Sequence, residues 1–367
     1  MAAFFILQHP NQVPPKMNVV KFLSSLCACL CLVQPGLAWD AEGHMVVARI
    51  AYNHLDSAVK ARCDALIAAP VTPGGSSTSN FVTAACWADD YKSQLGSSIW
   101  HYIDLPFSLD GTPTNGFVPA SFDVVQAINL SISTLQSSSA SQSNQAVSLR
   151  YLIHFVADIQ QPLHTSDAFF SSQPNGDAGG NGFYLKGTWS NLHYLWDDGG
   201  GYLLDNLPRP LSSSSQTTLS NKVAAIEAVY PYTRNVGTIP NPMDWAREGQ
   251  GVAKTVSYVG ISLNSTPSTS YTNTAQTTTG QRMALGGHRL ADLLNTLFAI
   301  RLDSVICTNG NVGFSWNAVS GQTYRVQWKQ QLGDSKWNDL TNITASGNSA
   351  SFSEPSGQTQ RFYQVTQ

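Results

Sequence analysis

The chain has 367 residues, of which 42% are hydrophobic and 12% are charged, and this is enough to bury a large core and more than one domain. Its formal net charge is −3 and it has no basic tract, which excludes a protein that holds duplex phosphates through lysine and arginine alone. Bound metal cations would lift that exclusion, because they can supply positive charge that the sequence lacks.

The N-terminal segment, residues 1–38, has the pattern of a secretory signal. It contains no acidic residue, and two lysines precede an apolar run over 22–33 and small residues that end at Ala38. We therefore expect cleavage after Ala38 and a secreted or periplasmic protein. Met17 is an alternative start, since residues 1–16 add nothing that a signal needs. No later segment is apolar enough to predict a transmembrane span.

Helical periodicity dominates residues 39–306. Apolar stripes predict helices over 44–69 with a restart at Asp56, 81–95, two stretches within 121–160, 242–262 and 281–303. Residues 70–80 and the glycine-rich 166–187 are predicted to be loops. The fold class expected here is mainly α with long connections.

After Cys307 the pattern changes to alternation, as at Phe314 and Trp316, with Gly and Asn between short runs. Residues 307–367 are therefore predicted to form a small all-β module. It resembles the fibronectin-like β-sandwich appendages of secreted bacterial enzymes, and its partner would be an unknown surface or polymer.

Three cysteines remain once the signal is removed: Cys63, Cys86 and Cys307. An odd number in an exported protein permits at most one internal bridge. A Cys63–Cys86 disulfide is one interpretation, and three free buried thiols are the other.

Two segments repeat a His-x-x-x-Asp spacing. His154 and Asp158 are four residues apart in a predicted helix and share one face. His193 and Asp197 repeat this spacing, and His164 lies between the two pairs. One such pair alone is usually a surface ion pair. Two pairs with a third histidine favour a metal site, and imidazole with carboxylate oxygens suits zinc, although manganese or iron would also fit. A structural zinc site would favour cysteine ligands, so the pattern favours catalysis.

Three further residues join this set: His44, Asp89 and His101. Each alone is as typical of a core or solvated residue as of a ligand. Together with the two pairs and His164 they include five of the seven histidines that follow the signal.

Five motifs in order resemble those of the zinc-dependent single-strand nuclease and 3′-nucleotidase family: "WDAEGH", "CWADDYK", "WHYIDLP", "LRYLIHFVADIQQPLH" and "NLHYLWDD". "DWARE" (244–248) and "QRMALGGHRLADLLN" (281–295) resemble its later helices, so the match covers about 39–303. The resemblance implies a helical fold shared with zinc phospholipase C.

The resemblance also implies a ligand set for three Zn²⁺. The first ion would be held by Asp89, His101, His154 and Asp158, and the second by His164, His193 and Asp197. The third would be held by His44, a bridging Asp158, and the α-amino group and carbonyl oxygen of Trp39, which cleavage after Ala38 would free.

Three more positions have roles implied by the family. Asp89 would also orient the nucleophile. Lys92 stands where the family commonly has an arginine that stabilises the transition state, and lysine keeps the charge but loses the bidentate fork. Tyr102 and Asp104 fall where the family stacks and hydrogen-bonds a base, although Tyr102 is also compatible with a core role.

The function expected is a zinc-dependent endonuclease that cleaves single-stranded DNA and RNA to 5′-phosphate products and acts on 3′-nucleotides, as a monomer. One alternative is a zinc phospholipase C-like phosphodiesterase. Another is a non-catalytic binding protein that zinc stabilises and whose β-module provides adhesion.

Overall fold

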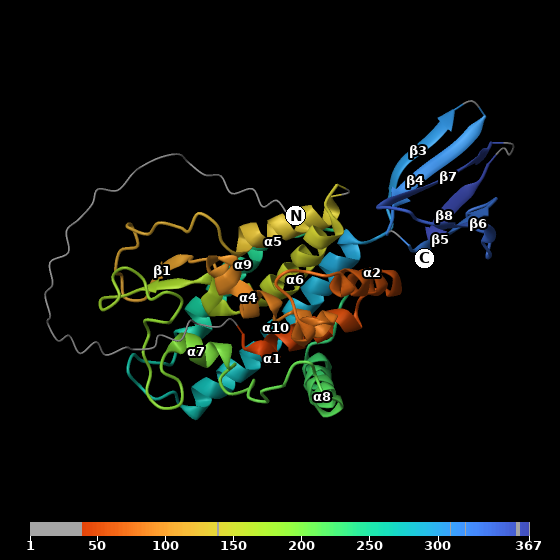
Figure 1. Ribbon diagram of the computed structural model, residues 1–367. Helices are drawn as coiled ribbons and strands as arrows, with labels where there is room; N and C mark the ends of the chain where they lie inside the picture. The colour runs from red at the N-terminus through yellow and green to blue at the C-terminus, as the bar shows by residue number, and fades with distance from the viewer. Residues whose placement is uncertain (1–38, 138, 309, 320, 357–359, 367) are drawn as a thin grey trace, which may run out of the picture. The chain divides into compact units, whose positions relative to one another are not determined.

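The computed structural model describes residues 39–137, 139–308, 310–319, 321–356 and 360–366. The predicted signal, residues 1–38, lies outside the described residues. Helices α1 to α10 are followed along the chain by six strands, β3 to β8 (Figure 1). This confirms the predicted fold class, a mainly helical part followed by an all-β module.

The helices account for most of residues 41–297. Their bounds are α1 Ala41–Asn53, α2 Ser57–Ala68, α3 Phe81–Ala84, α4 Trp87–Leu95, α5 Val124–Gln136, α6 Gln142–Asp158, α7 Leu192–Asp197, α8 Ser213–Val229, α9 Pro242–Val252 and α10 Thr269–Leu297. Short 3₁₀ turns cover Ser76–Thr78, Ser98–His101 and Pro162–Thr165, and a π-helical turn follows α9 at Ala253–Ser257. Strands β1, Pro106–Ser108, and β2, Asp167–Phe169, form a two-stranded parallel sheet.

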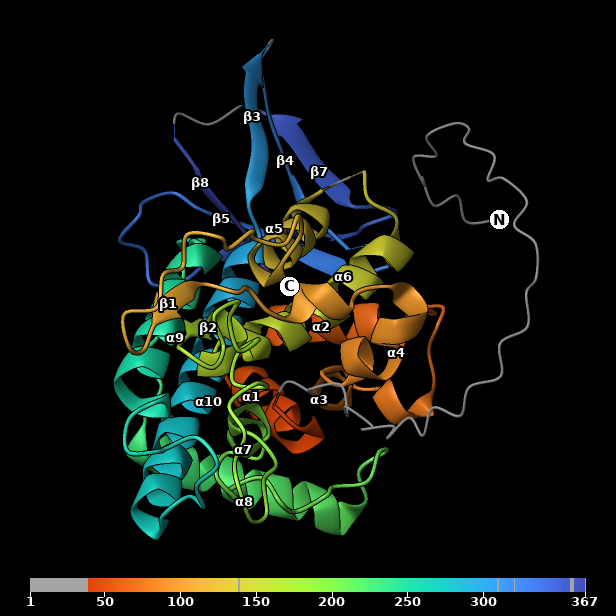
Figure 2. The same ribbon diagram turned by 90° about the vertical axis from the view of Figure 1, so that its left-hand side faces the viewer.

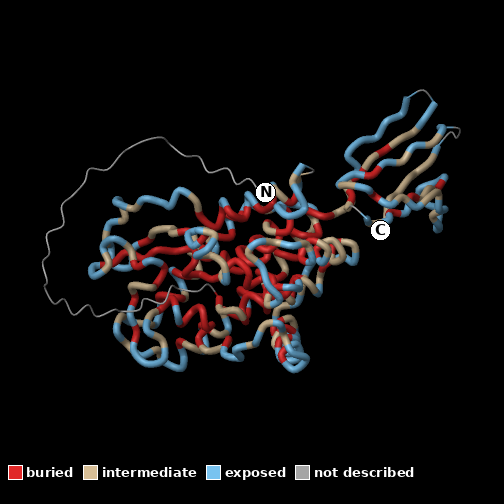
Figure 3. Tube along the Cα trace, in the orientation of Figure 1, coloured by how far each residue is buried: buried red, intermediate tan, exposed pale blue. Residues whose placement is uncertain are grey.

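Helix α6 lies in the core and ends in the residues that matter for the site. Ser141 caps its N-terminus by accepting a hydrogen bond from the backbone of Asn144, and every residue from Ser148 to Asp158 is buried. Helices α5 and α2 pack against it, and Figure 3 shows the buried chain concentrated in the interior of the helical part. Because α6 is covered on all sides, it has no solvent-facing side, and its polar side chains are buried together with its apolar ones.

Helix α10 packs against α1 with unusually close backbones. A Cβ atom added at Gly287 would lie 2.4 Å from Ile50 Cγ2 and 3.1 Å from the carbonyl oxygen of Val47, so only glycine fits at this crossing. The two adjacent glycines within the predicted stripe of α10 therefore allow the backbones of α1 and α10 to approach closely. Figures 1 and 2 show α1 and α10 together, with α8 alongside α1.

The predicted Cys63–Cys86 disulfide is wrong, since both thiols are free and buried. Cys63 belongs to the larger hydrophobic cluster, around α2 and α6, whereas Cys86 belongs to a second cluster around Trp39 and α1. Cys86 Sγ contacts the carbonyl oxygen of Ala41 at 3.5 Å, and burial raises the pKa of its thiol to about 12. Cys307 is free but exposed, so the alternative of three buried thiols holds for two of them.

The β-module consists of two three-stranded antiparallel sheets. Its strands are β3 Leu302–Thr308, β4 Asn311–Asn317, β5 Thr323–Lys329, β6 Asn338–Thr344, β7 Ser349–Pro355 and β8 Phe362–Thr366. The sheet orders are β3-β4-β7 and β6-β5-β8. Phe314, Trp316, Tyr324 and Val326 are buried in their shared core, as the alternation predicted. The first strand begins five residues before the predicted boundary at 307.

Candidate metal centre

Asp158, the last residue of α6, lies at the centre of a buried histidine cluster. One carboxylate oxygen, Oδ1, is 2.9 Å from Nε2 of His44 on α1. The other, Oδ2, is 3.0 Å from Nδ1 of His101 and 3.0 Å from Nε2 of His154. The side chains of Asp158, His44 and His154 have no solvent exposure. Helix α1, the turn at His101 and α6 thus bring four predicted ligands to one point.

Asp89, on α4, forms the outer wall of this cluster. Its Oδ1 is 3.5 Å from His101 Nδ1 and 3.8 Å from His154 Nε2, and it accepts a hydrogen bond of 3.1 Å from Lys92 Nζ one helical turn away. Burial alone would raise the pKa of Asp89, but the neighbouring histidines and Lys92 lower it to about 2. The carboxylate is therefore ionised and available as a ligand at neutral pH. The charge of Lys92 also acts on His193, so this lysine lies near both groups of ligands.

A second group combines His164, which follows α6, with His193 and Asp197 of α7. Nε2 of His193 is 3.4 Å from Asp197 Oδ2, and Nε2 of His164 is 3.9 Å from Asp197 Oδ1. Gln161 Nε2 donates to the same Oδ1 at 2.8 Å. All three predicted ligands are buried, and their ligand atoms lie within 4.8 Å of one another.

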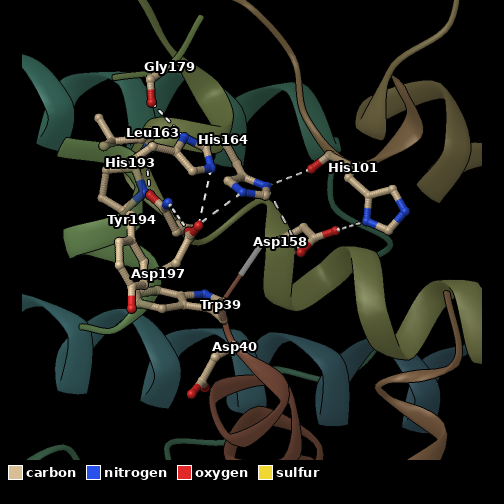
Figure 4. Close-up of polar contacts among 12 residues, drawn as sticks. Trp39, Asp40, His101, Asp158, Leu163, His164, Gly179, His193, Tyr194 and Asp197 are labelled. Carbon is tan, nitrogen blue, oxygen red and sulfur yellow. Dashed lines mark hydrogen bonds and ion pairs between the residues drawn. The ribbon is translucent and has the colours of Figure 1, made fainter. Parts of the chain in front are cut away.

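Backbone carbonyl groups orient the histidine rings. A carbonyl oxygen can only accept, so each Nδ1 that contacts one carries the proton, and the neutral ring then leaves a lone pair on Nε2. The pairs are His154 with Ala85 O at 2.6 Å, His193 with Gly179 O at 2.6 Å, His164 with His101 O at 2.8 Å and His44 with Asp40 O at 3.2 Å. Figure 4 shows the rings of His164 and His193 aimed toward Asp197. This is the carbonyl–histidine arrangement typical of metal ligands.

The donor set fits metal cations. With its proton on Nδ1, His44 presents a lone pair to Asp158 Oδ1, and two lone pairs at 2.9 Å require a proton or a cation where they meet. Among the described residues, Nε2 of His101 and Nε2 of His164 are buried without a hydrogen-bond partner. Buried polar atoms without partners are costly. A metal bound by the second group would satisfy His164 Nε2, whereas His101 faces Asp158 through Nδ1 and its Nε2 points elsewhere.

Comparison with known proteins decides the family. The profile of the S1/P1 Nuclease family matches residues 39–299, which is most of the chain. The chain belongs to the S1/P1 nuclease family. It is thus a metal-dependent endonuclease with the helical, phospholipase C-like fold of that family.

Three relatives illustrate the similarity. Nuclease S1 of Aspergillus oryzae is 32% identical over 201 residues, which cover 50% of this chain and 64% of the relative. Endonuclease 3 of Arabidopsis thaliana is 27% identical over 301 residues, or 76% of this chain and 96% of the relative. Nuclease P1 of Penicillium citrinum is 27% identical over 281 residues, or 71% and 97%.

Trp39, the first described residue of this S1/P1 nuclease, is held between the two ligand groups. Its ring is buried and its Nε1 donates to Ala157 O at 3.1 Å, next to Asp158. The following backbone N–H, of Asp40, points at Asp197 O at 3.4 Å. Asp40 also caps α1, which starts the helix that carries His44 (Figure 4). The N-terminal backbone of the predicted mature protein therefore lies beside the cluster.

Burial sets the protonation of the second group. It lowers the pKa of His164 to about 3 and that of His193 to about 4, so both are neutral, the form that binds metal. Burial also raises the pKa of Asp197 well above its usual range. At Asp158 burial acts in the same direction, but His154 and the other two histidines lower its pKa well below the usual range. A cation beside Asp197 would compensate the cost of its buried charge.

Tyr102 and Asp104 contribute no atom to the two ligand groups. Tyr102 is partly exposed and its carbonyl accepts from Val124 N at 3.1 Å, at the start of α5. Asp104 faces other carboxylates instead: burial, followed by the charges of Asp167 and Asp177, raises its pKa to about 7. Both residues stay predicted substrate contacts.

We expect Asp104→Asn to stabilise the metal-free nuclease at pH 8 by about 1 kcal/mol, a Tm rise of about 2–4 °C. The pKa of Asp104 is higher in the folded state than in the unfolded state, so protonation of this carboxyl favours folding. This contribution to stability is complete below pH 3.8, where the group is protonated in both states, and it is lost as pH rises toward about 7 and the buried carboxyl must ionise. The difference should vanish at pH 4 in thermal unfolding experiments. An equal Tm difference at both pH values would contradict this assignment.

Sequence reasoning missed five groups that position the predicted ligands: Gln161 and the carbonyl groups of Asp40, Ala85, His101 and Gly179. Gln161 had a usable signal, because it lies between two predicted ligands in "ADIQQPLH". The carbonyl groups had none, since every residue carries a carbonyl. Gly179 itself is explained by its φ of +62° and by Leu163 O, which would lie 2.4 Å from an added Cβ.

Proposed function

We propose that this S1/P1 nuclease cleaves single-stranded DNA and RNA to 5′-phosphate products and removes phosphate from 3′-nucleotides, with three zinc ions at the histidine cluster. The observation that carries the proposal is the single buried point at which Asp158 meets three histidine rings from three segments. The similar proteins whose names are Nuclease S1 and Nuclease P1 support the same activity.

We assign the ligands of the three ions as follows. Asp89, His101, His154 and Asp158 would hold one, and His164, His193 and Asp197 another. The third would lie between His44, Asp158 and the amine and carbonyl of Trp39. Support comes from the distances above and from the unpartnered Nε2 atom of His164.

Zinc bound here would supply Lewis-acid activation of a water molecule and charge neutralisation at the phosphodiester. The protein's own groups would then position the reaction. Asp89, ionised and at the outer wall, would accept a hydrogen bond from the attacking water and orient it. The ammonium of Lys92, 3.1 Å from Asp89, would stabilise negative charge that develops on phosphate oxygens.

The charge balance of the site explains how a protein of net charge −3 would bind a polyanion. Three dications against three ligand carboxylates leave a net positive site, which attracts phosphate without a basic patch. Tyr102 offers a π-face on which a base could stack, and a base must leave a duplex to reach it. We therefore propose a preference for single strands.

The predicted export remains part of this proposal, because residues 1–38 lie outside the described residues. In the part of the chain that the structure describes, no helix combines the length and apolar character needed to cross a membrane. The division into a nuclease domain, 39–306, and a β-module, 307–367, is likewise proposed. So are a monomeric state and the binding of a surface or polymer by the β-module.

The function can be tested with purified, zinc-loaded protein that begins at Trp39. We expect it to digest single-stranded DNA and RNA oligonucleotides much faster than a duplex of the same sequence, to leave 5′-phosphate ends, and to release phosphate from 3′-AMP. Mass spectrometry of the fragments identifies the ends. Intact single strands together with hydrolysis of phosphatidylcholine would instead establish a phospholipase-type activity.

A further inference from the structure

Among the described residues, two histidines are not used by the nuclease site, and they meet at a different place in the helical part. His54 directly follows the last residue of α1, His288 lies in the middle of α10, and Glu227 lies near the end of α8. One ligand atom from each of the three side chains lies within 4.8 Å of the others. The residues are 61 or more positions apart in sequence, so the fold of three helices creates this cluster.

The cluster has a free coordinating atom. His54 Nε2 forms a hydrogen bond with Glu227 Oε1. Nε2 of His288 is buried and has no hydrogen-bond partner within the described chain. Burial lowers the pKa of His288, which keeps its ring neutral and able to donate a lone pair. The hydrogen bond between His54 and Glu227 does not account for this unpartnered nitrogen of His288.

Neighbouring groups fix the ligands in place. Asn295 Nδ2 donates to His54 O at 3.0 Å, which ties the end of α1 to α10. The ring of Tyr232 stacks on His54 with ring centroids 4.1 Å apart and lies 5.2 Å from the ring of His288. Tyr232 OH donates to Asp292 Oδ1 at 2.5 Å, which holds the tyrosine in turn. Such support reduces the cost of ordering side chains when a metal binds.

We propose that His54, Glu227 and His288 form an additional metal site that binds one Zn²⁺. Two imidazoles and a carboxylate match the ligand preference of zinc and disfavour Ca²⁺ and Mg²⁺, which prefer oxygen donors. The site is separate from the nuclease centre, because His54 is ten residues beyond His44 along α1, about 15 Å at 1.5 Å per residue.

The position of the site defines its role. The side chains of His54 and Glu227 are only 25% and 21% exposed, so the ion would lie in the seam between helices with one coordination position left for water. The buried face of α8 has few large apolar side chains. The ion would link this helix to α1 and α10, which pack against each other. The site thus stabilises the fold rather than catalysing the reaction.

The test counts metal ions in whole protein. After equilibrium dialysis against Zn²⁺ and elemental analysis, the unmodified protein should hold one equivalent more than His288→Asn and one more than Glu227→Gln. Glu227→Gln keeps an acceptor for His54 and removes only the charge. Tyr232→Phe is the matched control: it keeps the stacked ring, provides no ligand and should retain the full count.

Two further readouts separate metal binding from a folding defect. Both ligand variants should keep hydrolysing single-stranded DNA at the unmodified rate, which shows that the fold and the nuclease centre survive. Zinc added to protein with a loaded nuclease centre should raise the Tm of the unmodified protein and of Tyr232→Phe, and of neither ligand variant. Equal zinc counts in the unmodified protein and both ligand variants would overturn the proposal.

Discussion

Asp158→Asn should lower the turnover of single-stranded DNA on the order of 10³-fold, about 4 kcal/mol of transition-state stabilisation. Both carboxylate oxygens of Asp158 face imidazole nitrogens from three segments. Asparagine offers one neutral oxygen and an NH₂ group in their place, so two of the proposed zinc sites would lose a ligand at once. The measurements are zinc content by elemental analysis and kcat on an oligonucleotide.

Two controls separate loss of metal from other effects. Lys92→Ala removes a charge beside Asp89 without removing a proposed ligand, so it should slow turnover while zinc content is unchanged. Asp244→Asn changes an exposed carboxylate on α9 and should change neither quantity. If Asp158→Asn retains full zinc content and normal turnover, the proposed bridging role is wrong.

A single residue added before Trp39 should remove one zinc ion from the protein and lower turnover about 10- to 100-fold. An internal Trp39 has an amide nitrogen, which coordinates zinc poorly, whereas a terminal Trp39 has an amine with a reference pKa of about 7.7–8.0. The buried ring of Trp39, bonded to Ala157 O, fixes that nitrogen beside the cluster. Mass spectrometry of the N-terminus, zinc analysis and kinetics on both forms measure the effect.

The matched control adds the same residue at the other end of the chain, after Gln367, and should behave as the processed form does. We expect the ring of Trp39 to stay buried in every form, so the Tm should differ little between them apart from the contribution of the lost ion. Equal zinc content and equal turnover in the extended and processed forms would refute the role of the Trp39 amine.

Helices α1, α4 and α6, which carry predicted ligands, were predictable from local patterns, whereas α7 and α8 were not. The spacing of His154 and Asp158 predicted their shared face because one helix holds both. In α8 only Ser215, Leu219, Val223 and Ile226 are buried, and its remaining residues are mostly small or polar, so its periodic signal is weak. The polar first half of α10 hid its start at Thr269 for the same reason.

Contacts between distant segments were beyond local patterns. The motif order resembled a family, and that resemblance predicted which histidines meet. Spacing alone predicted only the shared helix face of His154 and Asp158 and its repetition at His193 and Asp197. The free state of Cys63 and Cys86 depends on which core cluster each joins. The meeting of His54 with His288 depends on how closely α1 and α10 pack, which the glycines of α10 permit.

The end of α6 has an electrostatic consequence for the metal centre. A helix carries about half a negative elementary charge at its C-terminus, from carbonyl groups that lack intrahelical partners. Asp158 is the last residue of this 17-residue helix and is buried, so solvent screens that charge little. The partial negative charge at the end of α6 therefore favours cations bound at this site. Unlike the charge of the carboxylates, it does not disappear at low pH.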